Sequence, residues 1–370
     1  MKKIILITNV MTPYRKPLYD EIYERCLKLN IQFKVYCLFE TKNWKYNDLK
    51  NNYTELLSGK LFRIYGLEIP FNFEIRKKLK YEKPDILIIA GSWMSFTNYL
   101  INLKKYKIVF WSESNLLGIK RINGIKERIW SFFRTKFYRK VNYFLVPGKN
   151  AEETVLKWRN LSNRPKFISF PNTIEEISFT HLEKEKYDER TKIFLITARL
   201  VKVKGIIEFV ENVKDIIKNE KIKILIAGEG ELKDKIESKI KEYGLENKII
   251  LLGYIDPKLL RDYYLKADFF VLPSLYDPSP LSVIEALYYE LPILISNKLG
   301  NMPEVFNNNG AVFDPFDKSD LEQKIIKLLT WDEKDYNEAR EKSKKIYLEK
   351  FNKKRIITVF LDEILKILFS

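Results

Sequence analysis

Two carboxylates flank the predicted start of a helix in the stretch YDPSPLSVIEAL, residues 276–287. Asp277 lies in a loop rich in Pro and Ser, and Glu285 lies just over one turn inside the apolar segment that follows. Ser279 is a favoured N-cap residue and Pro280 a favoured first helical residue, so we predict that the helix begins at Pro280. A helix start binds anions, because its first amides have no partner within the helix and its dipole is positive there. Acids beside such a place favour a ligand with both phosphates and hydroxyl groups.

The predicted helix would present the amides of Leu281 and Ser282 to a diphosphate, since Pro280 has no amide hydrogen. Glu285 is four residues beyond Leu281 and therefore on the same side of the helix, where it could accept hydrogen bonds from the two hydroxyls of a ribose. Asp277 could reach a sugar on the far side of the phosphates. The competing interpretation is an exposed helix with ordinary surface acids.

Two cations follow a predicted strand in TARLVKVKG, residues 197–205. Arg199 sits at the strand's end, and Lys204 with Gly205 opens the next helix. Both side chains would then project into a cleft, where they could neutralise phosphates. A solvated pair of surface cations is the alternative in a chain so rich in Lys.

The stretch AGEGEL, residues 227–232, predicts a strand, a Gly-x-Gly turn and a helix. It is not the dinucleotide-binding fingerprint, because no third glycine follows and no acid ends the next strand. A tight turn is the simpler interpretation.

Short apolar runs rich in β-branched residues alternate with helical patterns along the whole chain. The predicted strands cover residues 2–10, 31–39, 84–91, 106–112 and 141–147 in the first half, and 192–200, 221–230, 247–255, 267–274 and 291–297 in the second. Runs this uniformly apolar are typical of strands buried on both faces of a parallel sheet. The alternation predicts an α/β protein with a doubly wound sheet that is formed twice.

A chain of 370 residues is long for one domain and suits two. We predict an N-terminal Rossmann-like domain at 1–171, a polar and charge-rich linker at 172–191 and a C-terminal Rossmann-like domain at 192–350. The amphipathic end of the chain, 351–370, would cap the second domain or cross back to the first. Ligands of doubly wound sheets bind outside the carboxyl ends of the strands, so the two domains should face each other across a ligand-binding cleft.

The composition favours a negatively charged partner. Lys and Arg number 66 against 49 for Asp and Glu, a formal net charge of +17, although abundant Lys, Ile and Asn point to a general compositional bias as one source. Nucleic acid, an anionic membrane surface and phosphorylated substrates are the partner classes that this charge admits. The two cysteines, Cys26 and Cys37, do not form a disulfide framework and favour a reducing compartment.

The N-terminal run MKKIILITNV is basic and then apolar, but it is short and lacks a small-residue cleavage site, so a first buried strand explains it better than a signal peptide. No stretch approaches the length that spans a membrane. We therefore expect a cytoplasmic protein that can be peripheral on the inner face of the cell membrane.

Several motifs together resemble a known family. The segment PSLYDPSPLSVIEALYYELPILISNKLGNMPEV resembles the donor-site signature, with its E-x7-E motif, of the retaining group 1 glycosyltransferases, glycosyltransferase family 4. The resemblance continues in TARLVKVKG, AGEGEL and LGYIDPKLLRDYYLKADFFVLPS, and it covers roughly residues 190–315. In the first half, TNVMTPYRKPLYDEI resembles the PYR-containing branch, whose members often build bacterial surface polysaccharides. The resemblance implies the two-domain GT-B fold.

It also implies a donor substrate, a UDP- or GDP-sugar, bound mainly by the second domain. Arg199 and Lys204 would hold the diphosphate and stabilise the leaving charge in place of a metal. Glu285 would bind the ribose, and Asp277 would bind hydroxyls of the donor sugar. Three further residues would lie near the base: Gly228, Tyr254 and Ile255.

No metal site is expected. The sequence contains no Asp-x-Asp, and its single histidine, His181, lies in the predicted linker, which also argues against a Ser-His-Asp triad. We expect no cofactor and no metal requirement.

The sequence departs from the family pattern in three places. Asp277 stands where the family usually has Glu, and Pro280 replaces a usual glycine, which removes one amide donor. The loop from Asn9 to Arg15 lacks the glycine pair that many members use near the phosphates. Tyr14 and Arg15 would instead serve acceptor binding, or they are loop packing and a surface cation.

A fourth difference concerns FWSESNLLGIKR, which follows the predicted strand ending at Trp111. Many family members carry a histidine hereabouts that touches the donor sugar, and Glu113 is the nearest polar candidate here. An acid can accept a proton or orient an acceptor hydroxyl. A structural hydrogen-bonding role for Glu113 is the alternative.

Residues 120–141, KRINGIKERIWSFFRTKFYRKV, carry eight basic residues and one acid. One helix face would hold Ile125, Ile129, Phe133, Phe137 and Val141, with Trp130 and Phe132 beside it. Such a helix can lie on an anionic membrane, or its stripe can be core and its basic face merely solvated. Nucleic acid is not expected as a partner, because no recognised binding module surrounds these residues.

The sequence thus predicts a retaining, metal-independent glycosyltransferase that moves one sugar from a nucleoside diphosphate to a growing glycan, whose lipid carrier would be a polyprenyl pyrophosphate. A GT-B-type epimerase or phosphorylase is a second enzymatic reading. The non-enzymatic alternative is a nucleotide-sugar or polyanion-binding protein whose catalytic site has decayed. The missing histidine and the Glu-to-Asp change at 277 are its support.

Overall fold

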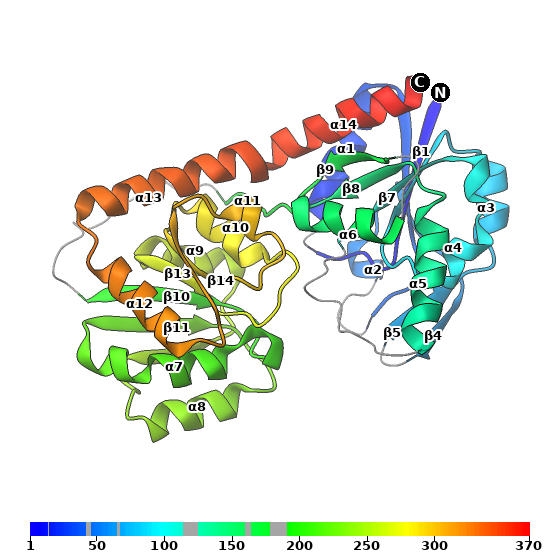
Figure 1. The fold of residues 1–370 in the computed structure, drawn as a ribbon. Coiled ribbons are helices and arrows are strands. Elements are labelled where there is room, and N and C mark those ends of the chain that lie inside the picture. The colour runs from blue at the N-terminus through cyan, green and yellow to red at the C-terminus, as the bar shows by residue number, and fades with distance from the viewer. Residues whose placement is uncertain (14, 42–45, 65–66, 114–124, 160–163, 178–190) are drawn as a thin grey trace. The chain divides into compact units, whose positions relative to one another are not determined.

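The computed structural model describes residues 1–370 except 14, 42–45, 65–66, 114–124, 160–163 and 178–190. The chain divides into two compact units (Figure 1). The first unit comprises Met1–Pro171 together with Lys353–Ser370, and the second comprises Asn172–Asn352. Each unit is an α/β structure around a parallel sheet, as the sequence pattern predicts.

The first unit contains a seven-stranded sheet in the order β3-β2-β1-β6-β7-β8-β9. Its strands, all paired in parallel, are β1 (Lys2–Thr8), β2 (Ile31–Cys37), β3 (Thr54–Leu56), β6 (Ile86–Ala90), β7 (Lys107–Trp111), β8 (Tyr143–Val146) and β9 (Lys166–Ser169). Ile4 and Leu6 pack into one apolar core and Ile5 and Ile7 into another, so β1 is buried on both faces. This two-sided burial explains the near-continuous apolar runs.

Helices cover both faces of this sheet. On one side lie α1 (Lys16–Lys28) and α14 (Lys353–Phe369), whose apolar residues join those of Ile4 and Leu6. On the other lie α3 (Ile75–Glu82), α4 (Phe96–Leu100), α5 (Ile125–Tyr138) and α6 (Lys149–Arg159). Short elements complete the unit: α2 (Tyr46–Leu49), η1 (Leu103–Lys105) and an antiparallel hairpin of β4 (Lys60–Ile64) and β5 (Leu67–Phe71).

The predicted apolar stripe of α5 divides into two parts. Phe137 and Val141 are buried in the core, together with Tyr138. Phe132 and Phe133 are exposed. The side chains of Ile125, Ile129 and Trp130 lie outside the described residues. One stretch of the predicted stripe therefore packs inward, as the core interpretation expects, and another faces outward.

The second unit contains a six-stranded parallel sheet in the order β12-β11-β10-β13-β14-β15. Its strands are β10 (Lys192–Thr197), β11 (Ile222–Ala227), β12 (Ile249–Gly253), β13 (Phe269–Leu272), β14 (Ile293–Ser296) and β15 (Gly310–Phe313). One face packs α7 (Ile206–Asn219), α8 (Lys233–Glu242) and α12 (Lys318–Leu329). The other packs α9 (Pro257–Lys266), α10 (Leu281–Tyr288) and the end of α13 (Glu333–Ile346).

Three short helical pieces lie between these elements: η3 (Lys202–Lys204), α11 (Met302–Val305) and the π-helical turn η4 (Tyr347–Phe351). The strand order of the second unit reverses between β10 and β13, and that of the first unit reverses between β1 and β6. Where the strand order reverses, the loops after the two strands run to opposite faces of the sheet. They leave a crevice outside the carboxyl ends of these strands, where doubly wound sheets bind ligands. The loops that follow these strands are therefore the places to look for a site.

Candidate functional site

The switch point of the second unit brings together two loops that lie far apart in sequence. The loop after β10 carries Arg199 and Lys204, and the loop after β13 carries Asp277. The amide of Leu275 donates to the carbonyl of Val203 at 2.9 Å and joins the two loops. The ammonium group of Lys204 forms an ion pair with the carboxylate of Asp277, and the two side chains are only 15% and 10% exposed. Two residues that were singled out separately in the sequence therefore form one contact.

Gly205 makes this close approach of the loops possible. Its φ of 65° lies in the left-handed region, and a Cβ atom there would stand 2.4 Å from the carbonyl oxygen of Pro273. A side chain would push the loops apart, and Lys204 would no longer meet Asp277.

Asp277 is held in place by further bonds. Its Oδ1 accepts the amide of Ser279 at 3.2 Å, and its own carbonyl accepts the amide of Gly300 at 2.7 Å. A third bond runs from the amide of Asp277 to the carbonyl of Lys298 at 3.4 Å. The carboxylate is thus a fixed group rather than a mobile surface acid.

The helix start differs from the prediction. Helix α10 begins at Leu281, one residue later than expected, and Pro280 is its N-cap with φ −67° and ψ 126°. The hydroxyl of Ser279 does not cap the helix, and it is buried without a hydrogen-bond partner in the described part of the chain. The reason is that Asp277 takes the amide of Ser279 and turns the chain, which leaves Pro280 extended.

The correction leaves the predicted anion donors in place. Leu281 and Ser282 are the first two residues of α10, so their amides have no acceptor one turn earlier in the helix. The side chain of Arg199, two residues beyond the end of β10, is exposed and makes no ion pair or hydrogen bond with the other described residues. All these donors follow the two strands of one switch point. Several donors close together are what the binding of a diphosphate requires.

Glu285 lies half-buried on α10 and is bound by a residue that sequence reasoning missed. The hydroxyl of Tyr264, on α9, donates to Oε2 of Glu285 at 2.7 Å. The same hydroxyl lies 2.8 Å from Oγ1 of Thr197, at the end of β10. Tyr264 is buried, and its ring stacks on Tyr289 with centroids 5.0 Å apart. Nothing in the pattern DPKLLRDYYLKA distinguishes Tyr264 from an ordinary core tyrosine, so its contact follows only from the packing of α9 on α10.

Two features around Glu285 shift the pKa of its carboxyl in opposite directions. Burial raises the pKa of the Glu285 carboxyl, and the hydrogen bond from Tyr264 lowers that pKa and so opposes part of the rise. Oε1 receives no hydrogen bond from the described residues. One carboxylate oxygen is thus fixed by the protein, and the other can accept a ligand hydroxyl.

The glycines of AGEGEL are required by the backbone. Gly228 has φ 146°, and a Cβ there would lie 1.9 Å from the carbonyl oxygen of Ala198. A Cβ on Gly230 would lie 2.4 Å from the carbonyl oxygen of Leu200. The turn therefore packs directly against the loop that carries Arg199, which accounts for the Gly-x-Gly pattern without a ligand.

Tyr254 and Ile255 follow the end of β12, next to the Gly228 turn. The amide of Gly228 donates to the carbonyl of Gly253 at 2.7 Å and ties the two loops together. Tyr254 is 72% exposed, and Ile255 is half-buried. The three residues that we expect near a base thus lie along one edge of the sheet, and an exposed aromatic ring there is available for stacking.

In the first unit, the structure brings Arg15 and Glu113 together across 98 residues of sequence. Nη2 of Arg15 lies 2.7 Å from Oε1 of Glu113, with side chains that are 14% and 36% exposed. The guanidinium also lies over the ring of Trp111, 4.6 Å from its centroid. Tyr14 lies outside the described residues. Glu113 is therefore engaged by a cation, which supports an orienting role more than that of an isolated proton acceptor.

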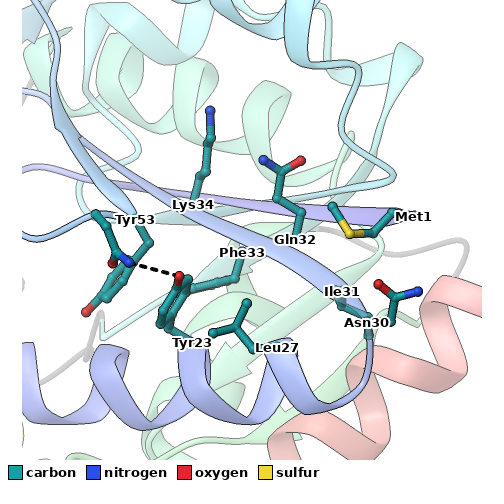
Figure 2. A pocket seen from close by; sticks show the side chains of 10 residues that line it. Met1, Tyr23, Leu27, Asn30, Ile31, Gln32, Phe33, Lys34 and Tyr53 are labelled. Atoms are coloured by element: carbon teal, nitrogen blue, oxygen red, sulfur yellow. Dashed lines mark hydrogen bonds between the residues drawn. The ribbon is translucent and has the colours of Figure 1, made fainter.

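A cavity of about 270 Å³ in the first unit lies elsewhere (Figure 2). It opens at the amino ends of β1 and β2, between Met1, Tyr23 and Lys34, and a bond of 3.1 Å from Asn52 to the Tyr23 hydroxyl crosses it. Arg15 and Glu113 follow the carboxyl ends of β1 and β7, so the cavity lies at the opposite edge of the sheet and contains none of the predicted site residues.

The described residues include no group of three or more His, Cys, Asp or Glu side chains that is arranged to hold a metal ion. Cys26 and Cys37 are both buried free thiols. Among the helices described, none combines the length and the apolar character needed to cross a membrane.

Part of the chain resembles known proteins in sequence. Residues 178–346 match the family model described as glycosyl transferases group 1. An uncharacterized glycosyltransferase of Methanocaldococcus jannaschii is 27% identical over 165 residues, which are 44% of this chain and 42% of that protein.

A Campylobacter jejuni relative is 26% identical over 242 residues, 64% of this chain and 62% of its own length. Its name is GalNAc-alpha-(1->4)-GalNAc-alpha-(1->3)-diNAcBac-PP-undecaprenol alpha-1,4-N-acetyl-D-galactosaminyltransferase. The chain therefore spans less than two thirds of the length of either of these curated relatives.

The fold as a whole is shared with solved structures. A Staphylococcus aureus TarM variant, in complex with fondaparinux, alpha-GlcNAc-glycerol and UDP, superposes with a TM-score of 0.70 over 100% of both chains at 14% identity. Residues 178–346 thus match the group 1 glycosyl transferases, and the two Rossmann-like units have the GT-B fold.

Proposed function

We propose that the protein is a retaining, metal-independent glycosyltransferase. It moves a sugar from a nucleoside diphosphate, UDP or GDP, to a growing glycan. The observation that carries the proposal is the set of groups at one switch point: Arg199, Lys204, Asp277, the first amides of α10 and Glu285. A sugar nucleotide has matching parts, namely a ribose, a diphosphate and a sugar, in that order.

The donor would lie along this edge of the sheet. Glu285 accepts hydrogen bonds from the ribose hydroxyls through Oε1, and Tyr254 lies against the base. The amides of Leu281 and Ser282 bind the diphosphate together with Arg199. Lys204 moves from Asp277 to the phosphates, because a diphosphate offers it a larger negative charge than one carboxylate.

The same movement gives Asp277 its role. In the free protein its carboxylate binds Lys204. When Lys204 turns to the diphosphate, Asp277 becomes free to accept hydrogen bonds from the donor sugar, while its bonds to Ser279 and Gly300 keep it in place. Binding the donor therefore exchanges one ion pair for two contacts with the ligand.

Transfer breaks the bond between the anomeric carbon and the diphosphate oxygen, which keeps the electron pair. The acceptor hydroxyl attacks the anomeric carbon from the face that the diphosphate leaves, and its proton passes to the departing phosphate. Arg199, Lys204 and the amides of α10 stabilise the negative charge that grows on the phosphate, which is the work that a metal ion does in other enzymes. No residue of the site is needed as a covalent nucleophile.

Arg15 and Glu113 are proposed to serve the acceptor. Their ion pair follows the carboxyl ends of two strands of the first unit, and Glu113 can orient a hydroxyl. The name of the Campylobacter jejuni relative includes an undecaprenol-linked diphosphate acceptor, which supports a polyprenyl-pyrophosphate-linked glycan here. The net charge of +17 fits such an anionic acceptor and a peripheral position on the cytoplasmic face of the membrane in bacterial surface polysaccharide synthesis.

Hydrolysis of the donor without acceptor tests the proposal. Release of UDP or GDP from its sugar nucleotide is measured with EDTA present, since a transferase lets water replace the acceptor slowly and a pure binding protein does not. We expect release by the wild type that Lys204→Ala lowers by at least about 100-fold, as removal of one oxyanion-stabilising donor does.

Lys235→Ala is the matched control, because Lys235 is an exposed lysine on α8. It should release nucleotide at the wild-type rate. Binding of the sugar nucleotide without any release would favour a non-catalytic binding protein, and an absolute need for a divalent metal would reject the metal-independent mechanism.

A further inference from the structure

The first unit carries a group of aromatic side chains that face solvent. Its members are exposed by 40% to 65%, and we call them the aromatic surface: Phe62, Phe73, Tyr99, Phe132 and Phe133. They come from the β4–β5 hairpin, the segment after it, α4 and α5. Figure 1 shows the hairpin, α4 and α5 on the same side of this unit.

Ring contacts connect these side chains into two adjoining rows. Measured between ring centroids, Phe62 lies 6.2 Å from Phe71 and 5.9 Å from Phe96, and Phe71 lies 4.3 Å from Phe73. On the next elements, Tyr99 lies 6.3 Å from Phe133, which lies 5.7 Å from Phe132.

Phe96 and Tyr99 are three residues apart on α4 and are neighbours on one helix surface, so α4 joins the two rows. Exposed apolar residues are ordinary when scattered, but a connected set marks an interaction site.

The hairpin that carries Phe62 is held rigidly. Asn72, which is fully buried, donates from Nδ2 to the carbonyls of Leu38 at 2.9 Å and Leu57 at 3.1 Å. Thr97 donates to Oδ1 of Asn72 at 2.9 Å and so ties α4 to the same point. The rings are therefore presented by a fixed frame.

Exposed cations border the aromatic surface. The basic side chains on these elements are Lys60, Arg63, Arg76, Lys136 and Arg139. Nε of Arg76 donates to the carbonyl of Leu100 at 2.8 Å, which places its guanidinium beside α4, and Nζ of Lys136 lies 5.9 Å from the centroid of Phe132.

Two acids are described on the hairpin and the segment after it. Glu68 is bound to Arg63, and Glu74 accepts the amide of Ser58. Five cations against these two carboxylates leave the border with a net positive charge.

The aromatic surface lies near the edge of the sheet that carries Arg15 and Glu113. The hairpin follows β3 and α4 follows β6, whereas Arg15 follows β1 and Glu113 follows β7. All these strands are parallel, so the four connections leave from the same edge of the sheet. Whatever binds the aromatic surface is therefore held near the residues that we propose to serve the acceptor.

We infer that the aromatic surface docks the first unit on a bilayer with anionic headgroups. Phe side chains on the apolar face of a peripheral protein enter the boundary between headgroups and acyl chains, and bordering cations are drawn to anionic lipid. This inference rests on the proposed function, because it places the unit on the membrane in which a polyprenyl-linked acceptor would lie. A second copy of the chain or another protein could also pack against the exposed rings, but neither of them requires a basic border.

Cosedimentation with vesicles tests the inference on the full chain. The vesicles are phosphatidylcholine alone, or phosphatidylcholine with about one third phosphatidylglycerol, the anionic component that attracts polybasic surfaces. We expect binding to the anionic vesicles that falls with added salt, and weak binding to the neutral ones. The triple variant Phe62→Ser, Phe73→Ser, Phe132→Ser should bind anionic vesicles at least about ten-fold more weakly, because it loses three rings that enter the interface.

Phe369→Ser is the matched control. Phe369 is 71% exposed on α14, which packs on the other face of the sheet, and its loss should leave vesicle binding unchanged. Urea unfolding of the first unit shows that each variant is folded, and donor hydrolysis in solution reports on the transferase separately.

Three outcomes overturn the docking inference: no binding to anionic vesicles, equal binding by the triple variant, or self-association without lipid that the triple variant loses. In each case, unchanged donor hydrolysis would leave the proposed transferase standing.

Discussion

At the scale of single residues, Glu285 is the group whose charge matters most to the proposed donor site. Burial raises the pKa of its carboxyl, and Tyr264 partly opposes that rise. The folded state therefore binds a proton at Glu285 more readily than the unfolded chain does. The stabilisation that comes from the protonated form is present at low pH and is lost as pH rises through the raised pKa. The ligand-binding form, by contrast, is the carboxylate, so nucleotide affinity should fall when the pH drops towards that pKa.

Tyr264→Phe should move this loss of affinity to higher pH. The phenol stabilises the charged carboxylate, so its removal raises the pKa of Glu285 further. The measurement is the nucleotide dissociation constant as the pH is lowered step by step from neutrality. Tyr263→Phe, on the same helix, is the control and should follow the wild-type profile. A Tyr264→Phe profile that is weaker at every pH by the same factor would mean that Tyr264 only supports the fold.

Arg15 and Glu113 should act as a pair. Because their side chains are in contact, Arg15→Gln and Glu113→Gln should each slow transfer to acceptor, and the double variant should be less impaired than the product of the two effects. The coupling expected for contacting residues is about 0.5–3 kcal/mol. Transfer kinetics of the four proteins give this value. Nucleotide affinity should stay at the wild-type level in all three variants. A coupling energy of zero would show that the two residues act independently.

At the scale of elements, the loops after β10 and β11 depend on glycines that have no room for a side chain. Gly228→Ala would place a methyl group 1.9 Å from the carbonyl oxygen of Ala198, at a φ of 146°. We expect it to destabilise the second unit by more than about 3 kcal/mol, since strain and a backbone clash add.

Gly244→Ala provides the matched comparison, since Gly244 also has a positive φ of 66° but no atom within 4 Å of the added Cβ. It should cost only about 1–2 kcal/mol, the cost of a left-handed conformation alone. Urea unfolding of the two variants gives both values. Equal losses of unfolding free energy would show that the close approach of the two loops does not contribute to stability.

The sequence predicted the elements of the second unit better than their ends. The long apolar runs located every strand from β10 to β14, because burial on both faces leaves a continuous signal. It missed β15 in the second unit, and β3, β9 and the β4–β5 hairpin in the first, all of which are short and lack that signal. The start of α10 was placed one residue early, because the bond from the Ser279 amide to Asp277 depends on the loop and not on capping preference.

At the scale of the whole molecule, the chain ends by completing the unit in which it began. Helix α14 packs its apolar face into the same core as β1 and α1, with Ile357 and Ile364 fully buried. Arg25 of α1 donates to the Thr358 hydroxyl at 2.7 Å and fixes the helix from outside. The first unit is therefore built from both ends of the sequence.

Ile364→Ala should destabilise the first unit by about 2–5 kcal/mol, the cost of removing most of a buried aliphatic side chain. Val359→Ala on the same helix should change stability by less than about 0.5 kcal/mol, because Val359 is 41% exposed. Chemical denaturation gives both numbers, and the nucleotide-induced shift of the second unit should remain in each variant. Equal effects of the two substitutions would show that α14 is not part of this core.

Fold class was predictable at this scale because alternating strands and helices repeat over the whole chain. The contacts of the candidate site were not. Lys204 with Asp277, Tyr264 with Glu285, and Arg15 with Glu113 each join residues of different loops or helices. Such contacts depend on how loops and helices meet at a sheet edge, and local sequence patterns do not encode that geometry.

Thermal unfolding with nucleotides tests the central claim most directly. The wild type and Glu285→Ala are melted in EDTA, alone and with excess UDP, GDP, ADP or CMP. A ligand present at about one hundred times its dissociation constant stabilises by roughly 2.7 kcal/mol, enough to move the midpoint. We predict a shift of the wild type with UDP or GDP, and its loss in Glu285→Ala. No shift with any nucleotide, or an equal shift in both proteins, would contradict a donor site built around Glu285.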